Sequence, residues 1–284
     1  MITLLFLQFN VWAQPDTLIG ENTFKYKIQN GEILRSKHVI IQNTYDLSDK
    51  ILWQTLFRDS LMNIKEYTAF IYDNELLLSA ETYNNNDSVI AIKRYSYTSN
   101  NNLSNILFYK RINNKMKLVK QKKYHYKDTL LLKKETLNRK NKWLKRTTYT
   151  YTDTTIIENI QFKKGSRDDK LKSKQTTSQL KDEIVQSSII NSQYYTGKMD
   201  TIKVDYDYDP KINKLIKEIW KDNSDSVQKI VEYRYNRDTG VKIGEGILDG
   251  SGNYLEFLGF IRNKRAVIMK EVKMYDLNQK NSNK

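Results

Sequence analysis

Tyrosines recur along the chain in Tyr-x-Tyr pairs, and each pair precedes a polar corner and then a run rich in Leu, Ile and Val. Five pairs begin at Tyr95, Tyr124, Tyr149, Tyr206 and Tyr233, which are 29, 25, 57 and 27 residues apart. Residues two apart in a strand point to the same face, so each pair lies on one side of its strand. Asn and Asp at the corners favour turns. The pattern predicts a β-hairpin of about 27 residues, repeated eight or nine times.

A single hairpin is barely stable, whereas stacked hairpins can bury a shared aromatic ladder. We therefore expect an all-β fold, with one domain over residues 14–277 and a frayed tail over 278–284. The expected architecture is an elongated, open antiparallel meander, and nine hairpins in one sheet would extend it to roughly 85 Å. Residues 48–67 fit either an amphipathic helix capped by Ser48 or two further strands.

Three stretches carry a family resemblance. They are "YDYDPKINKLI" (206–216), "YNRDTGVKIGEG" (235–246) and "YKIQNGEIL" (26–34). They resemble the tyrosine-anchored YD repeats of Rhs-type bacterial proteins and, more loosely, MORN repeats, and the likeness extends over most of residues 20–275. Only the second and third stretches keep the Gly that sets the turn in a YD repeat. The resemblance implies a secreted β-hairpin array rather than a large shell that encloses a toxin.

The first residues give a cellular address. Residues 2–13 are mostly apolar and uncharged, and Val11 and Ala13 stand at the −3 and −1 positions of a small-residue cleavage site. A positive n-region is missing, so residues 1–13 are interpreted as the truncated end of a signal peptide, with a buried N-terminal strand as the alternative. The mature chain would begin at Gln14 or Pro15. We expect an exported protein of the periplasm, cell surface or extracellular space, without a transmembrane helix.

The net charge of +15 is concentrated in one basic band. Fifteen Lys and Arg residues but only two acids, Asp128 and Glu135, lie between Lys110 and Arg146. Such a band can attract an anionic glycan, an acidic envelope protein or nucleic acid, and export argues against nucleic acid. The alternative is a solvated face whose lysines keep exposed strands from pairing with other molecules.

No residue pattern indicates catalysis or a cofactor. The chain has no cysteine, and its two histidines, His38 and His125, are far apart, so neither thiol chemistry nor a zinc site is expected. Asp205, Asp207 and Asp209 resemble the start of an EF-hand loop, but Pro210 replaces the required Gly. We expect these three aspartates to lie on the strand face opposite the neighbouring tyrosines.

The sequence therefore predicts a non-catalytic binding or structural module of the bacterial envelope. The alternatives are a secreted polysaccharide-active enzyme and an outer-membrane β-barrel. Against the barrel, neither alternating face of residues 115–126 is apolar throughout. The partner and the oligomeric state stay open. The candidate binding residues are six tyrosines beside five lysines of the band, with core packing as the alternative role of the tyrosines: Tyr95, Tyr97, Tyr124, Tyr126, Tyr149, Tyr151, Lys115, Lys117, Lys120, Lys122 and Lys123.

Overall fold

The computed structural model describes residues 18–165 and 170–263, and these form one all-β sheet without a helix. The expected signal peptide and the expected C-terminal tail lie outside the described residues. The strands are β1 (Ile19–Gln29), β2 (Glu32–Tyr45), β3 (Ile51–Phe57), β4 (Ile64–Asp73), β5 (Leu76–Asn84), β6 (Val89–Tyr97), β7 (Leu103–Ile112), β8 (Lys115–Lys127), β9 (Leu130–Asn138), β10 (Trp143–Tyr151), β11 (Thr155–Phe162), β12 (Leu171–Lys181), β13 (Ile184–Tyr194), β14 (Met199–Asp209), β15 (Lys214–Lys221), β16 (Val227–Tyr235), β17 (Lys242–Asp249) and β18 (Tyr254–Asn263).

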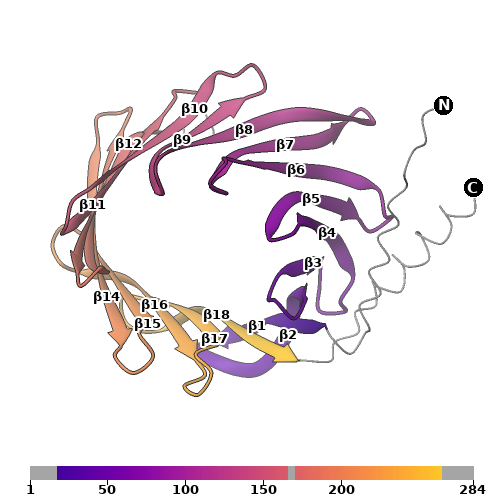
Figure 1. Cartoon of the computed structure of the whole chain (residues 1–284). Coiled ribbons are helices and arrows are strands. Elements are labelled where there is room, and N and C mark those ends of the chain that lie inside the picture. Colours follow the sequence, from indigo (N-terminus) through magenta and orange to yellow (C-terminus); the bar gives the residue numbers. More distant parts are fainter. Residues whose placement is uncertain (1–17, 166–169, 264–284) are drawn as a thin grey trace, which may run out of the picture.

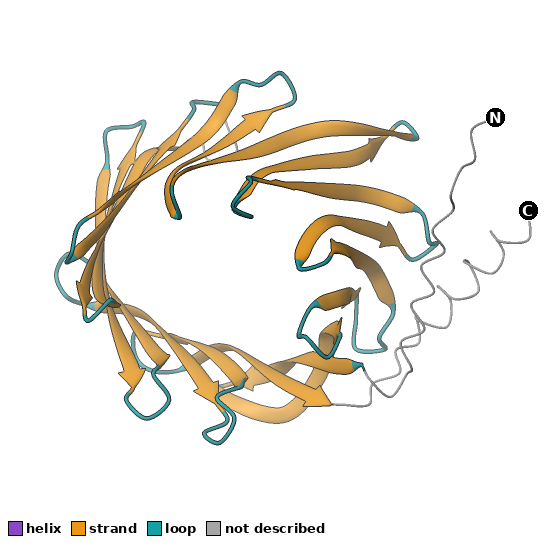
Figure 2. Ribbon diagram, viewed as in Figure 1, coloured by secondary structure: helices purple, strands orange, loops and turns teal. Residues whose placement is uncertain are grey.

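The sheet closes on itself into an 18-stranded antiparallel barrel, which Figures 1 and 2 show as a continuous ring of strands. Each strand pairs with the next along the chain, and β1 pairs with β18, with Thr23 opposite Phe260. The expected open, elongated meander is therefore wrong. Strand twist and coiling bring the ends of the sheet together, and pairing them removes both exposed edges.

The corners of the barrel are built largely from Asn and Asp, many of which have positive φ. The side chain that ends a strand also fixes the turn after it. The Asn84 carboxamide oxygen accepts hydrogen bonds from the backbone N–H groups of Asn86 and Ser88, both at 3.0 Å. Asp222 makes the same pair of contacts with Ser224 and Ser226. Short polar side chains that bond to the nearby backbone explain why these corners need few glycines.

Residues 48–67 do not form a helix. They contribute β3 and the beginning of β4, joined by a turn in which Asp59 accepts hydrogen bonds from Leu61 and Asn63. The spacing of Leu52, Leu56 and Leu61 fits a helix as well as strands. Hydrogen bonding of β3 to β2 on one side and to β4 on the other decides in favour of strands. Leu56 lies opposite Ile41 of β2 and Glu66 of β4.

The two faces of the sheet differ in composition. We call one the tyrosine face, since it carries the six candidate tyrosines, and the other the amide face, after Asn159, Gln161, Gln175, Asn191 and Gln193. On the tyrosine face, small and aliphatic side chains are buried between the aromatic rings. Val204 is 0% exposed, and Thr147, Ile160, Ser188 and Ile190 are also buried. This thin layer, continued around the ring, is the main core of β6–β16.

Bulges interrupt the register between most neighbouring strands. Leu78 of β5 and Leu132 of β9 are examples of such extra residues, and both are exposed. An extra residue bends its strand and increases the local twist, which helps a long sheet to curl into a ring. Eighteen strands tilted as in known barrels enclose a lumen roughly 35 Å across, measured between backbones, which side chains cannot fill.

Candidate functional site

Two of the predicted lysines, Lys120 and Lys122 of β8, lie at the centre of a basic cluster on the tyrosine face. Lys122 lies on β8 in one cross-strand row with Ile106 of β7 and Tyr95 of β6. In the other direction the row continues through Thr136 of β9 to Lys145 of β10. Directly paired residues point to the same side, so the Tyr95 ring and the ammonium groups of Lys122 and Lys145 share the tyrosine face.

The neighbouring rows add three more lysines. Lys93 and Lys120 lie opposite Phe108 from its two sides, and Lys134 lies opposite Tyr124. The Lys120 and Lys122 ammonium nitrogens are 4.6 Å and 5.6 Å from the centroid of the Phe108 ring. We name Lys93, Lys120, Lys122, Lys134 and Lys145 the lysine cluster. It spans β6 to β10.

The lysine cluster has no compensating carboxylate among the described residues, where none of its five lysines forms an ion pair. Glu135 of β9 is close in sequence but lies on the amide face. There it contacts Arg146 at 2.8 Å, Lys133 at 3.1 Å and His125 at 3.4 Å. Burial, followed by repulsion from the other four ammonium groups, lowers the pKa of Lys122. The arrangement can offer several ammonium donors to one polyanionic ligand.

The structure places the other predicted lysines differently. Val119 is an extra residue in β8, because Phe108 pairs with Lys120 while Tyr109 pairs with Leu118. This bulge brings Lys115 and Lys117 to the same face as Lys120 despite their odd spacing, and both lie toward the β7–β8 turn. Lys123 instead lies on the amide face, opposite Glu135.

The six predicted tyrosines divide into two groups. The second tyrosine of a pair bonds to the preceding strand: the Tyr97 hydroxyl donates to the Leu77 carbonyl and the Tyr151 hydroxyl to the Leu131 carbonyl, both at 2.9 Å. Such tyrosines anchor a hairpin and need not contact a ligand. Tyr126, at the equivalent place in β8, has its pKa raised by burial.

The first tyrosines lie nearer to the middle of their strands. Tyr95 and Tyr124 flank Lys122, and burial raises the pKa of both hydroxyls. Tyr149 donates a hydrogen bond to Glu158 at 2.9 Å and stacks on Tyr151 with ring centroids 6.4 Å apart. Tyr95 and Tyr124 are therefore the two tyrosines that belong to the lysine cluster by position.

Sequence reasoning missed Lys93, which precedes the basic band, and did not single out Lys134 or Lys145 within it. Only the strand register unites them with Lys122. The aspartates of β14 follow expectation, because Asp205 and Asp207 lie on the amide face, and Asp205 is 2.6 Å from the Lys221 ammonium. Among the described residues, no group of three or more metal-ligating side chains gathers, and no helix is long and apolar enough to cross a membrane.

Comparisons with known proteins give structural neighbours only. No family model and no curated protein matches the chain. A porin-like protein from Bacteroides uniformis aligns with TM-score 0.43 and 7% identity, over 88% of this chain and 97% of that chain. A porin-like protein from Bacteroides vulgatus aligns with TM-score 0.40 and 12% identity, over 87% and 98%. TcdB2-TccC3 without its hypervariable C-terminal region aligns with TM-score 0.24 and 11% identity, over 77% of this chain but 15% of that chain. At these TM-scores no function follows from the similarity.

Proposed function

We propose that the protein is an exported, non-catalytic binding module of the bacterial cell envelope, whose tyrosine face binds an anionic glycan. The observation that carries the proposal is the lysine cluster. Five ammonium groups share one face without a carboxylate partner, and partly buried like charges destabilise the empty barrel. A ligand with several carboxylates or phosphates would relieve this repulsion, and Tyr95, Phe108 and Tyr124 offer aromatic surfaces for sugar rings beside the charges.

The proposal also requires that water, rather than lipid, covers both faces of the sheet. The amide face carries Arg94, Lys203, Lys217 and Lys221 within strands, and the tyrosine face carries the lysine cluster. An Arg or Lys on the lipid face of a barrel costs about 2–4 kcal/mol at the bilayer midplane. Neither face therefore offers lipid a continuous apolar band. This favours a barrel bathed in water on both sides, in the periplasm or at the cell surface.

The test compares two triple variants that remove the same charge. Lys120→Gln, Lys122→Gln and Lys134→Gln alter the lysine cluster, whereas Lys203→Gln, Lys217→Gln and Lys221→Gln alter the amide face. Binding to polygalacturonate, a carboxylated polysaccharide, is measured by calorimetry at several salt concentrations. We expect the first variant to lose binding and the second to keep it. Equal losses in both would reduce the effect to net charge, and intact binding in both would refute the lysine cluster as the binding site.

An outer-membrane pore is the second candidate, because closed barrels with an even number of strands are the form that spans bacterial outer membranes. Cell fractionation separates the two candidates. A periplasmic or carbonate-extractable protein supports the aqueous module. Retention in the outer membrane after carbonate extraction, together with single-channel conductance in planar bilayers, would instead establish the pore.

A further inference from the structure

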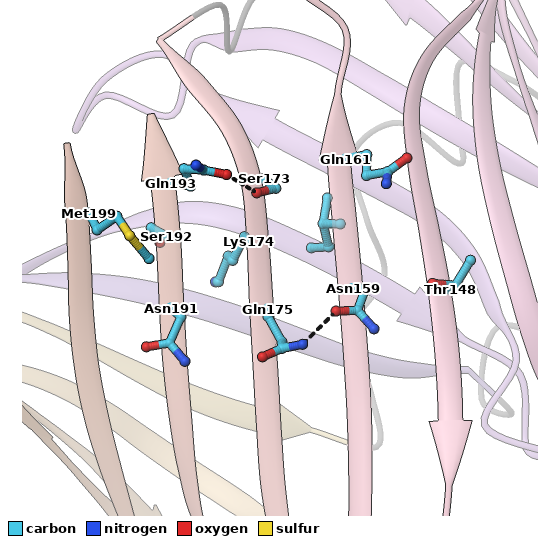
Figure 3. Close-up of a pocket in the computed structure, with 11 residues that line it drawn as sticks. Thr148, Asn159, Gln161, Ser173, Lys174, Gln175, Asn191, Ser192, Gln193 and Met199 are labelled. Carbon is cyan, nitrogen blue, oxygen red and sulfur yellow. Dashed lines mark hydrogen bonds between the residues drawn. The ribbon is translucent and has the colours of Figure 1, made fainter. Parts of the chain in front are cut away.

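The amide face holds a cavity on the opposite side of the wall from the tyrosines. It has a volume of about 520 Å³, within the usual range of small-molecule sites, and lies over β10–β14. Figure 3 shows the carboxamides of Asn159, Gln161, Gln175, Asn191 and Gln193 along these strands.

The lining residues are arranged in two rows by the strand register. The first row reads Thr148, Asn159, Gln175 and Asn191, and it continues beside the cavity to Thr201 of β14. The second row begins at Arg146 of β10, which lies beside the cavity, and continues through Gln161, Ser173, Gln193 and Met199. Neighbouring groups in a row are about 4.8 Å apart, and the two rows are about 7 Å apart. The result is a regular grid of hydrogen-bonding groups.

The amide-face side chains that line the cavity are uncharged, although 29% of the residues in the chain are charged. Lys174 is the one charged residue that lines the cavity, and it shares its row with Ile160 and Ser192, so its side chain belongs to the tyrosine face. Arg146 lies directly opposite Gln161 at the edge of the grid, but its guanidinium is already paired with Glu135 at 2.8 Å. A charged ligand would therefore gain little here, whereas a neutral ligand rich in hydroxyl groups could match each carboxamide.

Internal hydrogen bonds fix several of these side chains and leave others available. Gln175 Nε2 donates to Asn159 Oδ1 and Thr201 Oγ1 donates to Asn191 Oδ1, both at 2.9 Å. Within the described chain, no hydrogen bond engages the Nδ2 groups of Asn159 and Asn191 or the carboxamide of Gln161. Asn159 and Asn191 are thus held in place by their oxygens while their N–H groups stay available to a ligand, and Gln161 adds a free donor and acceptor. Side chains that are already held in place lose less entropy when a ligand binds.

From this geometry we propose that the amide cavity is a second binding site, specific for a neutral glycan that lies across β10–β14. Every second strand is about 9.6 Å away, a distance comparable to the length of a disaccharide in an extended chain. Successive sugars could then meet equivalent carboxamides. The site is distinct from the lysine cluster in position, charge and ligand class, and does not depend on it.

The test uses the whole chain and three neutral oligosaccharides: cellohexaose, chitohexaose and maltohexaose. Calorimetry compares the wild type with Gln175→Ala/Asn191→Ala and with the lysine-cluster triple variant, after circular dichroism and thermal unfolding have shown that both remain folded. We expect at least one neutral oligosaccharide to bind, with a loss of about tenfold or more in the amide variant, since each lost hydrogen bond is worth about a fivefold change. The lysine variant should bind it like the wild type.

Two results would overturn the proposal. One is the absence of binding by all three neutral oligosaccharides, and the other is equal binding by the wild type and the amide variant. Because polygalacturonate binding reports on the lysine cluster alone, failure of the amide site leaves that result unchanged, and the reverse also holds. Replacing Gln175 by Glu supplies a further check, since its direct partners Asn159 and Asn191 are uncharged. The new charge should weaken binding of the neutral ligand without creating affinity for polygalacturonate.

Discussion

Replacing Lys122 by Met should stabilise the barrel, because it removes the central charge of the lysine cluster. Met keeps an apolar stem that can pack on Phe108. The nearest cluster lysines are about 7 Å away by strand geometry, which gives about 0.6 kcal/mol of repulsion for each pair in a water-like dielectric. With four neighbours and discounting for solvent screening, we expect a gain of roughly 1 kcal/mol at low salt.

Salt and pH dependence identify the cause of that gain. The screening length falls from about 30 Å at 0.01 M to about 3 Å at 1 M salt, so the gain should vanish in 1 M NaCl. The pKa of Lys122 is lowered in the folded state, so the unfolded chain binds more protons up to pH about 10.5. Stability should therefore rise with pH in the wild type relative to Lys122→Met, approaching the variant as Lys122 loses its charge.

The assay is urea unfolding at 10 mM and 1 M NaCl, followed by circular dichroism. Lys123→Met is the matched control, since it is the neighbouring lysine on the amide face, opposite Glu135. It should show no gain at low salt. Loss of stability in Lys122→Met, or a gain that persists unchanged at 1 M NaCl, would refute the view that the cluster is electrostatically strained.

Three further predictions concern the barrel itself. Tyr151→Phe removes a hydrogen bond to a backbone carbonyl and should cost about 1 kcal/mol in urea unfolding, whereas Tyr206→Phe, which has no such bond among the described residues, should cost little. Burial and the nearby Glu21 carboxylate raise the pKa of Tyr45 to about 12, so its contribution to stability is complete below pH 10 and lost as pH rises through 12. An absorbance titration should find it ionising only with alkaline unfolding; ionisation near pH 10 in the folded protein would contradict this. Cysteines at Asn22 and Ile261, which are directly paired, should form an intramolecular disulfide, and intermolecular disulfides alone would indicate an open sheet.

The local structure was largely predictable from sequence, whereas closure was not. Period-two alternation and Asx-rich corners specify strands and turns within a few residues, as at Asn84 and Asp222. Closure depends on β1 meeting β18, and Thr23 and Phe260 are separated by almost the whole chain. No local signal encodes that pairing, because it results from twist accumulated over all eighteen strands.

The same distinction applies to the candidate site. Lys120 and Lys122 could be placed beside Tyr124 from spacing within β8. The bulge at Val119 could not be foreseen, and it reverses the face expected for Lys115 and Lys117. The partners on other strands required the register, which side-chain alternation alone does not supply. Sequence reasoning therefore found the basic band and two lysines of the cluster, Lys120 and Lys122, but not the three that complete it: Lys93, Lys134 and Lys145.

Closure also changes the interpretation of those lysines. A lysine-rich strand is a common way to keep an exposed sheet edge from pairing with other molecules, and an open meander would leave edges to protect. In the barrel every strand has a partner on both sides, including β1 and β18. Lys93, Lys120, Lys122, Lys134 and Lys145 lie in the middle of fully paired strands, so edge protection cannot account for them. Their mutual repulsion is what the Lys122→Met variant measures, and the proposed polyanion would compensate it.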